Sequence, residues 1–225
     1  MVTSMIKAVV FDLDDTLISE LDYVKSGFRH ISNILSLQLR QSREEIYNQL
    51  TEFFSEDTNM VFNRLFDKLS VSYTEDDILK LVDAYRSHMP EIKFYEDVLP
   101  VLDTLKQKNI KTGIITDGYA ITQRNKLQVL QADEYFDHII VTDELGRSYW
   151  KPNPLAFELM KEQLNVEFDE MMYVGDNPAK DFYIAARYPV KTVRIIRNSG
   201  VYTNTAYLHD VKEFYKVKSL YDIRV

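Results

Sequence analysis

Short apolar runs alternate with amphipathic segments along much of the chain. Five of the runs are rich in β-branched side chains, as buried strands are: 6–11, 110–115, 138–142, 171–174 and 190–196. Segments with helical periodicity lie between the later runs, at 98–108, 121–131, 154–164 and 179–187. Strands that alternate with short helices indicate a parallel sheet with both faces covered. We therefore expect an α/β fold with a doubly wound, Rossmann-like core.

Residues 19–93 differ from the rest because they contain no convincing strand. The first part carries an apolar stripe at helical spacing: Val24, Phe28, Ile31 and Leu35. Ser42 and Glu45 form the pattern of a capping box, and Thr74 to Asp77 can begin a further helix. We predict a helical domain, 19–93, inserted into a core domain of 1–18 and 94–225, with short linkers near 18–22 and 90–96.

The amino-acid composition limits the functional classes to which this protein can belong. The chain has 225 residues, of which 45% are hydrophobic, enough for one large domain or two modest ones. No apolar stretch approaches the roughly 18 residues of a membrane span, and the N-terminus does not resemble a signal peptide. There is no cysteine, so we expect a cytoplasmic protein without disulfides. The net charge of −8 argues against a nucleic-acid partner.

Polar residues follow the ends of the predicted strands. They are Asp12-Leu13-Asp14-Asp15-Thr16, Thr116-Asp117-Gly118, Lys151 in Trp-Lys-Pro, and Gly175-Asp176 followed by Asp181. In an open α/β sheet the ligand site lies beyond the carboxyl ends of the strands, so these groups should converge. Two carboxylates about 4 Å apart repel by roughly 4 kcal/mol at an effective dielectric near 20. A nearby positive group or a catalytic role must compensate for this repulsion.

The order and spacing of these stretches resemble the four motifs of the haloacid dehalogenase superfamily. Asp-x-Asp-x-Thr matches the first motif, Thr116 the second, Lys151 the third, and Gly-Asp-x-x-x-x-Asp the fourth. The resemblance spans residues 6–196 and implies that the helical insert is a C1 cap. It also implies a phosphatase, because dehalogenases and phosphonatases lack an acid at the position of Asp14, and mutases typically carry Gly-Val or Gly-Ile where this chain has Asp15-Thr16.

The same residues suggest a mechanism by their chemistry. The Asp12 carboxylate can attack phosphorus and form an aspartyl-phosphate. Asp14 can protonate the leaving alcohol and then deprotonate water. Thr116 and Lys151 can bind the phosphoryl oxygens, assisted by the backbone N–H groups of three residues: Leu13, Asp117 and Gly118. Asp15 is expected to turn away and contribute little.

A magnesium ion would offset the repulsion among the aspartates. Mg²⁺ takes six oxygen ligands, usually one or two carboxylates with waters and a substrate phosphate. We predict that Asp12, the carbonyl oxygen of Asp14 and Asp176 bind it, with Asp181 orienting a water or Lys151. The predicted function is Mg²⁺-dependent hydrolysis of a small phosphomonoester, a nucleotide or sugar phosphate, so the partner is a small phosphorylated metabolite.

Other interpretations remain. An Asp-rich turn after a strand is often a helix cap. A calcium loop is excluded, because Leu17 and Tyr23 stand where Gly and Glu are needed. A phosphosugar mutase or another phosphoryl transferase is the alternative enzyme; a dehalogenase or a non-catalytic binding module is less favoured. The histidines show no ligand pattern. Candidate substrate contacts in the insert are Asp22, Tyr23, Lys25, Arg29, His30, Arg64 and Lys68.

Overall fold

The structure is a computed structural model that describes residues 5–198, 200, 202 and 204–225. The chain divides into two compact units. One is formed by the chain up to Glu20 and from Ile92 onward, and the other by Leu21–Glu91. The second unit is therefore inserted into the first, after the first strand. The predicted limits of the two domains lie within two residues of this division.

The larger unit contains a parallel sheet of six strands in the order β3-β2-β1-β4-β5-β6. The strands are β1 Ala8–Phe11, β2 Lys111–Thr116, β3 His138–Val141, β4 Met171–Gly175, β5 Lys191–Ile195 and β6 Tyr215–Val217. The first five confirm the predicted α/β fold. We did not predict β6, because its three residues are too short for a periodic signal.

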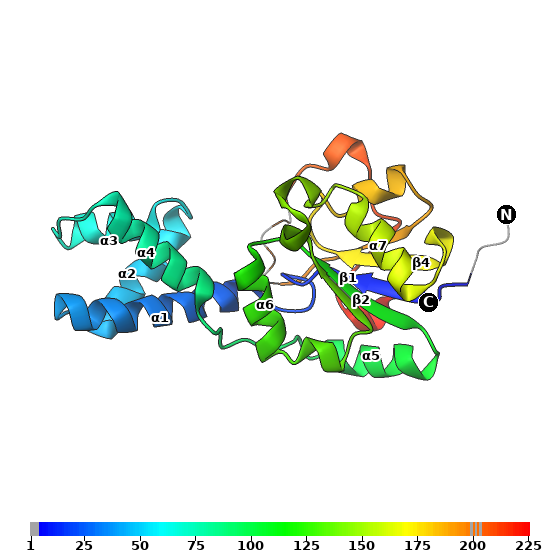
Figure 1. Ribbon diagram of the computed structural model, residues 1–225, viewed down its shortest axis with the longest axis horizontal. Helices are drawn as coiled ribbons and strands as arrows, with labels where there is room; N and C mark the ends of the chain where they lie inside the picture. Colours follow the sequence, from blue (N-terminus) through cyan, green and yellow to red (C-terminus); the bar gives the residue numbers. More distant parts are fainter. Residues whose placement is uncertain (1–4, 199, 201, 203) are drawn as a thin grey trace. The chain divides into compact units, whose positions relative to one another are not determined.

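Alternating side chains of β1 enter two separate cores. Val9 and Phe11 pack on one face with residues of α5 Val98–Gln107 and α6 Ala120–Val129. Ala8 and Val10 pack on the other face with α7 Leu155–Leu164. Figure 1 shows α5 and α7 on opposite sides of the sheet. Both faces are thus covered, which explains why the strands are nearly uninterrupted apolar runs.

The inserted unit consists of four helices around its own apolar core. They are α1 Glu20–Leu39, α2 Arg43–Glu56, α3 Val61–Lys68 and α4 Glu75–Ser87. Ser42 and Thr74 are the N-caps of α2 and α4, as predicted, and Thr74 forms a full capping box with Asp77. Among the candidate substrate contacts, the Tyr23 side chain is buried and Arg64 donates to the carbonyl oxygens of three residues of this unit: Phe53, Asp57 and Asn59.

Two local predictions differ from the structure. Within 179–187 there is only the short 3-10 helix Tyr183–Ala186, because side-chain hydrogen bonds organise the preceding turn. Asn177 Oδ1 accepts the N–H of Ala179 at 2.9 Å, and Asp181 Oδ2 accepts the N–H of Asn177 at 2.8 Å. The chain passes from one unit to the other between Glu20 and Leu21, within the range predicted for a linker near 18–22, but this stretch already belongs to α1, which begins at Glu20.

The chain enters and leaves the insert through neighbouring segments of the larger unit. Ile18 and Phe94 form an antiparallel bridge, and the Tyr95 N–H donates to the Leu17 carbonyl at 2.9 Å. Asp15, with a φ of 49°, accepts the Glu20 N–H at 3.0 Å. Asp15 therefore caps the start of α1, a structural contact that the expectation of a small part in the chemistry did not cover.

A buried arginine connects this crossing to the C-terminal segment. Arg197 forms two hydrogen bonds with the Asp97 carboxylate, at 2.7 and 2.9 Å, and two with the Thr16 carbonyl. Asp97 also accepts from Ser219 and from the Leu220 N–H. Burial raises the pKa of Asp97, but the hydrogen bonds from Arg197, Leu220 and Ser219 hold it below its ordinary value.

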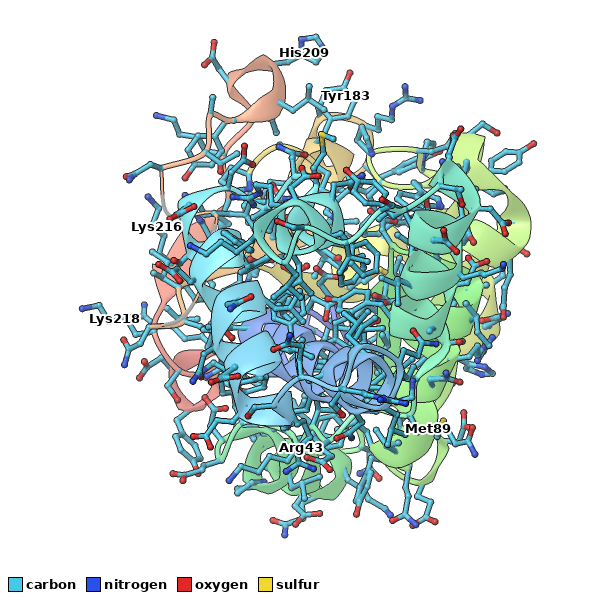
Figure 2. All side chains as sticks on the ribbon, turned by 90° about the vertical axis from the view of Figure 1, so that its left-hand side faces the viewer. Arg43, Met89, Tyr183, His209, Lys216 and Lys218 are labelled. Carbon is cyan, nitrogen blue, oxygen red and sulfur yellow. The ribbon has the colours of Figure 1, made fainter. Side chains whose placement is uncertain are left out.

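The edge of the sheet at β6 carries charge. Lys216 and Lys218 are exposed there, and Figure 2 shows both side chains projecting outward. Charged side chains on an edge strand oppose pairing with a second chain. In the described part of the chain, every helix is too short or too polar to traverse a bilayer.

We predict that Asp97→Asn lowers the free energy of unfolding by about 3–5 kcal/mol near neutral pH, because Arg197 stays buried without its counter-charge. Since the folded pKa of Asp97 is lowered, its contribution is present above the unfolded pKa of about 4 and is lost as the pH falls through the folded value. Urea unfolding of wild type and Asp97→Asn at several pH values measures both the loss of stability and its dependence on pH.

The matched control is Asp103→Asn, an exposed carboxylate on α5, the helix that directly follows Asp97. This change should alter stability by less than about 0.5 kcal/mol. A difference between wild type and Asp97→Asn that stays constant down to about pH 3 would contradict the assigned pKa direction.

Candidate active site

The predicted site residues lie where the strand order of the sheet reverses. β1 is central and pairs with β2 on one side and β4 on the other, and the chain proceeds outward in both directions. In doubly wound sheets this switch point opens a crevice beyond the carboxyl ends of the strands. Asp12 follows β1, Thr116 ends β2, and Asp176 follows β4, so all three reach this edge.

A buried lysine joins the central carboxylates. The Lys151 ammonium lies 2.8 Å from Asp12 Oδ1 and 2.9 Å from Asp181 Oδ1, and it donates to the Tyr173 hydroxyl at 2.8 Å. The Lys151 and Asp181 side chains are fully buried. Burial alone would lower the pKa of Lys151, but Asp12 and Asp181 raise it well above its usual value. Lys151 is thus a permanent cation beside Asp12.

The pKa of Asp12 is set by opposing effects: burial and the nearby Asp181 raise it, and Lys151 lowers it. Burial raises the pKa of Asp12 to about 6, although the Lys151 charge lowers it. Only one carboxylate oxygen of Asp12 is bound to Lys151. The arrangement therefore holds the Asp12 side chain in a defined rotamer while its second oxygen stays available for another partner.

Three carboxylates form a group that can hold a cation. Oxygen atoms of Asp12, Asp176 and Asp181 lie within 4.8 Å of one another, and all three residues are buried. Asp176 Oδ2 is buried without a hydrogen-bond partner among the described atoms. Burial, then Asp181 and Asp12, raises the pKa of Asp176 to about 9. A hard divalent cation such as Mg²⁺ fits these oxygen donors and would satisfy the unpartnered atom.

Gly175 makes room for this group. A Cβ atom at Gly175 would stand 2.5 Å from Asp181 Oδ2 and 2.8 Å from Asp181 Cγ. The same Asp181 oxygen accepts the Asn177 N–H at 2.8 Å, so the carboxylate has no freedom to retreat. Glycine at position 175 therefore permits the close approach of the Asp181 side chain to the end of β4.

The turn after β2 is held by the Asp117 side chain. Asp117 Oδ1 accepts from the Thr142 hydroxyl at 2.7 Å and from the Lys151 N–H at 3.1 Å. Asp117 Oδ2 lies 3.0 Å from the Lys180 ammonium. Burial raises the pKa of Asp117, but the charges of Lys151 and Lys180 bring it below its usual value. Asp117 thus anchors the segment that carries Lys151.

Asp14 faces a different set of partners from the other aspartates. Its carboxylate pairs with Lys126 and accepts from Gln123, both on α6, and it is absent from the carboxylate group around Asp176. The predicted metal ligand at this position is the Asp14 carbonyl oxygen, so the carboxylate contacts do not bear on it. The reaction roles of the predicted residues stay predictions.

Four contacts of the site were not predicted. Tyr173, Gln123, Lys126 and Lys180 carry polar groups to the predicted residues. Gln123 and Lys126 stand at helical spacing inside a segment read as amphipathic, and both are buried. In the sequence, the signal for this pair is two polar residues three positions apart in a predicted helix, a spacing that places them on one helix face.

Comparisons with known proteins identify the family and agree with the fold. The sequence model of the haloacid dehalogenase-like hydrolases matches residues 9–195. A glyceraldehyde 3-phosphate phosphatase of Methanopyrus kandleri is 35% identical over 86% of this chain and 85% of its own length. A putative pyrophosphatase PpaX of Clostridium perfringens is 33% identical over 77% of each chain. A HAD phosphatase structure from Thermococcus onnurineus is 27% identical, with a TM-score of 0.60, over 96% of this chain and 95% of its own.

The open parallel sheet and the acidic centre at its switch point define an enzyme of the α/β class. More specifically, the chain belongs to the haloacid dehalogenase-like hydrolase family, and it is a phosphatase of that family. The fold, the enzyme class and the family predicted from the four motifs are confirmed.

We predict that Mg²⁺ raises the melting temperature by about 5–10 °C when its concentration is about 100 times its Kd. The cation binds carboxylates that are brought together only in the folded state. Gly175→Ala should abolish most of this increase without removing any ligand atom, because the new methyl group displaces Asp181. Scanning calorimetry with Mg²⁺ and with EDTA measures the shift.

The control for the predicted effect of Gly175→Ala is the melting temperature of this variant in EDTA. A variant that folds in EDTA and still gains the full stabilisation from Mg²⁺ would show that Asp181 is not needed at the cation site.

Proposed function

We propose that this protein is a Mg²⁺-dependent phosphatase that hydrolyses a small phosphorylated metabolite through an aspartyl-phosphate on Asp12. The observation that carries the proposal is the position of Asp12. It follows the central strand at the switch point, with one carboxylate oxygen 2.8 Å from a fully buried lysine. Such a carboxylate is oriented by its neighbour and keeps an oxygen for attack on phosphorus.

In the first step, Asp12 forms a bond to phosphorus and the ester oxygen leaves with a proton from Asp14. In the second step, a water molecule gives a proton to Asp14, its oxygen bonds to phosphorus, and the Asp12–phosphorus bond breaks. Lys151 stabilises the negative charge next to Asp12 in both steps. A divalent cation held by Asp12, Asp176 and the Asp14 carbonyl oxygen would neutralise phosphate charge, with Asp181 orienting the surrounding groups.

The phosphoryl oxygens need further donors. We assign this role to the Thr116 hydroxyl and to the backbone N–H groups of Leu13, Asp117 and Gly118, at or just after the carboxyl ends of β1 and β2, and to Lys151 from the segment after β3. The contacts of Asp117 support the assignment to Lys151, because the Asp117 carboxylate accepts the Lys151 N–H and so fixes the loop that carries the lysine. Preorganised donors of this kind stabilise charge without reorganisation during the reaction.

Within the small phosphorylated metabolites, we propose a phosphorylated three-carbon sugar as the substrate class to test first. The support is the relative from Methanopyrus kandleri, whose name specifies glyceraldehyde 3-phosphate and which aligns over 85% of its length. Inorganic pyrophosphate is the second candidate, supported by the PpaX relative at 33% identity. The two differ in the leaving group, because an alkoxide needs a proton and a phosphate does not.

We predict that the enzyme releases phosphate from glyceraldehyde 3-phosphate faster than from pyrophosphate or nucleoside monophosphates, and only when Mg²⁺ is present. Asp12→Asn should reduce turnover by at least about a thousandfold, because the nucleophile is lost. A phosphate-release assay over this panel, with Mg²⁺ and with EDTA, measures both effects.

Asp103→Asn, which changes an exposed carboxylate on α5, is the control and should keep wild-type turnover. Turnover by Asp12→Asn near the wild-type rate would overturn the assignment of the nucleophile. A panel in which pyrophosphate ranks first would replace the proposed substrate class with the second candidate.

A further inference from the structure

Two buried side chains of α6 bind the Asp14 carboxylate. The Lys126 ammonium lies 2.7 Å from Asp14 Oδ1 and 2.9 Å from Oδ2, and Gln123 Nε2 donates to Oδ2 at 3.0 Å. Gln123 and Lys126 are three positions apart, so they share one face of the helix. The Lys126 side chain is 4% exposed and that of Asp14 is 21% exposed.

Gln123 also connects Asp14 to the end of β2. Its Nε2 lies 2.6 Å from the Thr116 hydroxyl oxygen, so one amide group bonds both Asp14 and Thr116. Gly118 leaves the space for this side chain, because a Cβ atom there would stand 3.0 Å from Gln123 Cδ. Gly118 also has a φ of 133°, a conformation that other residues rarely adopt. The β2 turn is therefore built around Gln123.

Stability alone does not explain this arrangement. Removing an ammonium and a carboxylate from water costs free energy that their attraction repays only in part, and apolar side chains of similar size often stabilise a fold as well. A lysine kept almost wholly buried against the carboxylate of Asp14 therefore points to a role in the function of Asp14.

We propose that Lys126 and Gln123 are positioning residues that hold Asp14 for proton transfer; this rests on the proposed function. An ionised carboxylate has about four lone-pair sites. Lys126 and Gln123 take three of them in the structure. One site is left to exchange a proton with the leaving group or with water, and its direction is set by the other three.

Lys126 also affects the charge that appears on Asp14. When the proton moves from Asp14 to the leaving oxygen, the carboxylate becomes negative and the ammonium stabilises it. This contribution matters only when the leaving group needs a proton. An alkoxide such as that of glycerol 3-phosphate needs one, whereas 4-nitrophenolate is a weak base and leaves without one.

The test compares kcat/KM of wild type and Lys126→Met for these two substrates, with Mg²⁺ present. kcat/KM reports the steps up to departure of the leaving group. We expect Lys126→Met to lose at least tenfold more kcat/KM with glycerol 3-phosphate than with 4-nitrophenyl phosphate. A role confined to the stability of the fold would lower both values alike.

A double-mutant cycle with Asp14→Asn tests whether Lys126 acts through Asp14. Adding Lys126→Met to Asp14→Asn should change kcat/KM for glycerol 3-phosphate by less than twofold. Arg124→Met is the matched control, because Arg124 lies on the same helix and pairs with Glu144. It should keep wild-type values for both substrates.

Equal losses with the two substrates, no loss with either, or full additivity in the cycle would each overturn the proposal. If Lys126→Met does not fold, as judged by circular dichroism, Lys126→Gln replaces it in the same measurements. Failure of the proposed function is seen separately, as wild-type rates for both substrates that do not depend on Mg²⁺ or on Asp12.

Discussion

The Lys151 ammonium lies between two buried carboxylates, and much of the site is arranged around that ion triad. Asp12 follows β1, Asp181 follows β4, and Lys151 is carried by the segment after β3, so three separate strands must be in register for the triad to form. When all three carboxylates are ionised, one lysine does not balance their charge, since Asp176 is also buried there and has an oxygen without a hydrogen-bond partner among the described atoms. The remaining negative charge makes the centre suitable for a divalent cation.

Around this triad, polar side chains connect the loops rather than the strands. Asp117 joins the β2 turn to the backbone of Lys151, and Gln123 joins the same turn to the loop after β1. Arg197 connects Thr16, which precedes the insert, with Asp97, which follows it. A parallel sheet alone would leave these loops free to move, because their backbone groups are not part of its ladder. The side-chain bonds therefore determine the relative positions of the reacting groups.

The family relationship and the geometry support different parts of the functional argument. Family membership and the phosphatase class follow from a match over residues 9–195 and from relatives more than 30% identical. The geometry explains how such chemistry is possible, through one oriented carboxylate, one buried cation and a set of oxygen donors. The substrate depends on contacts outside this centre, which is why the proposed three-carbon sugar phosphate needs a direct assay.

The sequence by itself determined the elements and the motif positions. Apolar strands and amphipathic helices have local periodicities, and the four motifs indicate their chemistry by their order and spacing along the chain. Only the tertiary structure decided which helix residues serve those motifs. Lys126 and Asp14 are 112 positions apart, and Arg197 and Asp97 are 100 apart, so no local pattern relates them. The short β6 strand and the absence of a full helix at 179–187 were likewise decided by pairing partners and side-chain bonds, which outweigh weak local preferences.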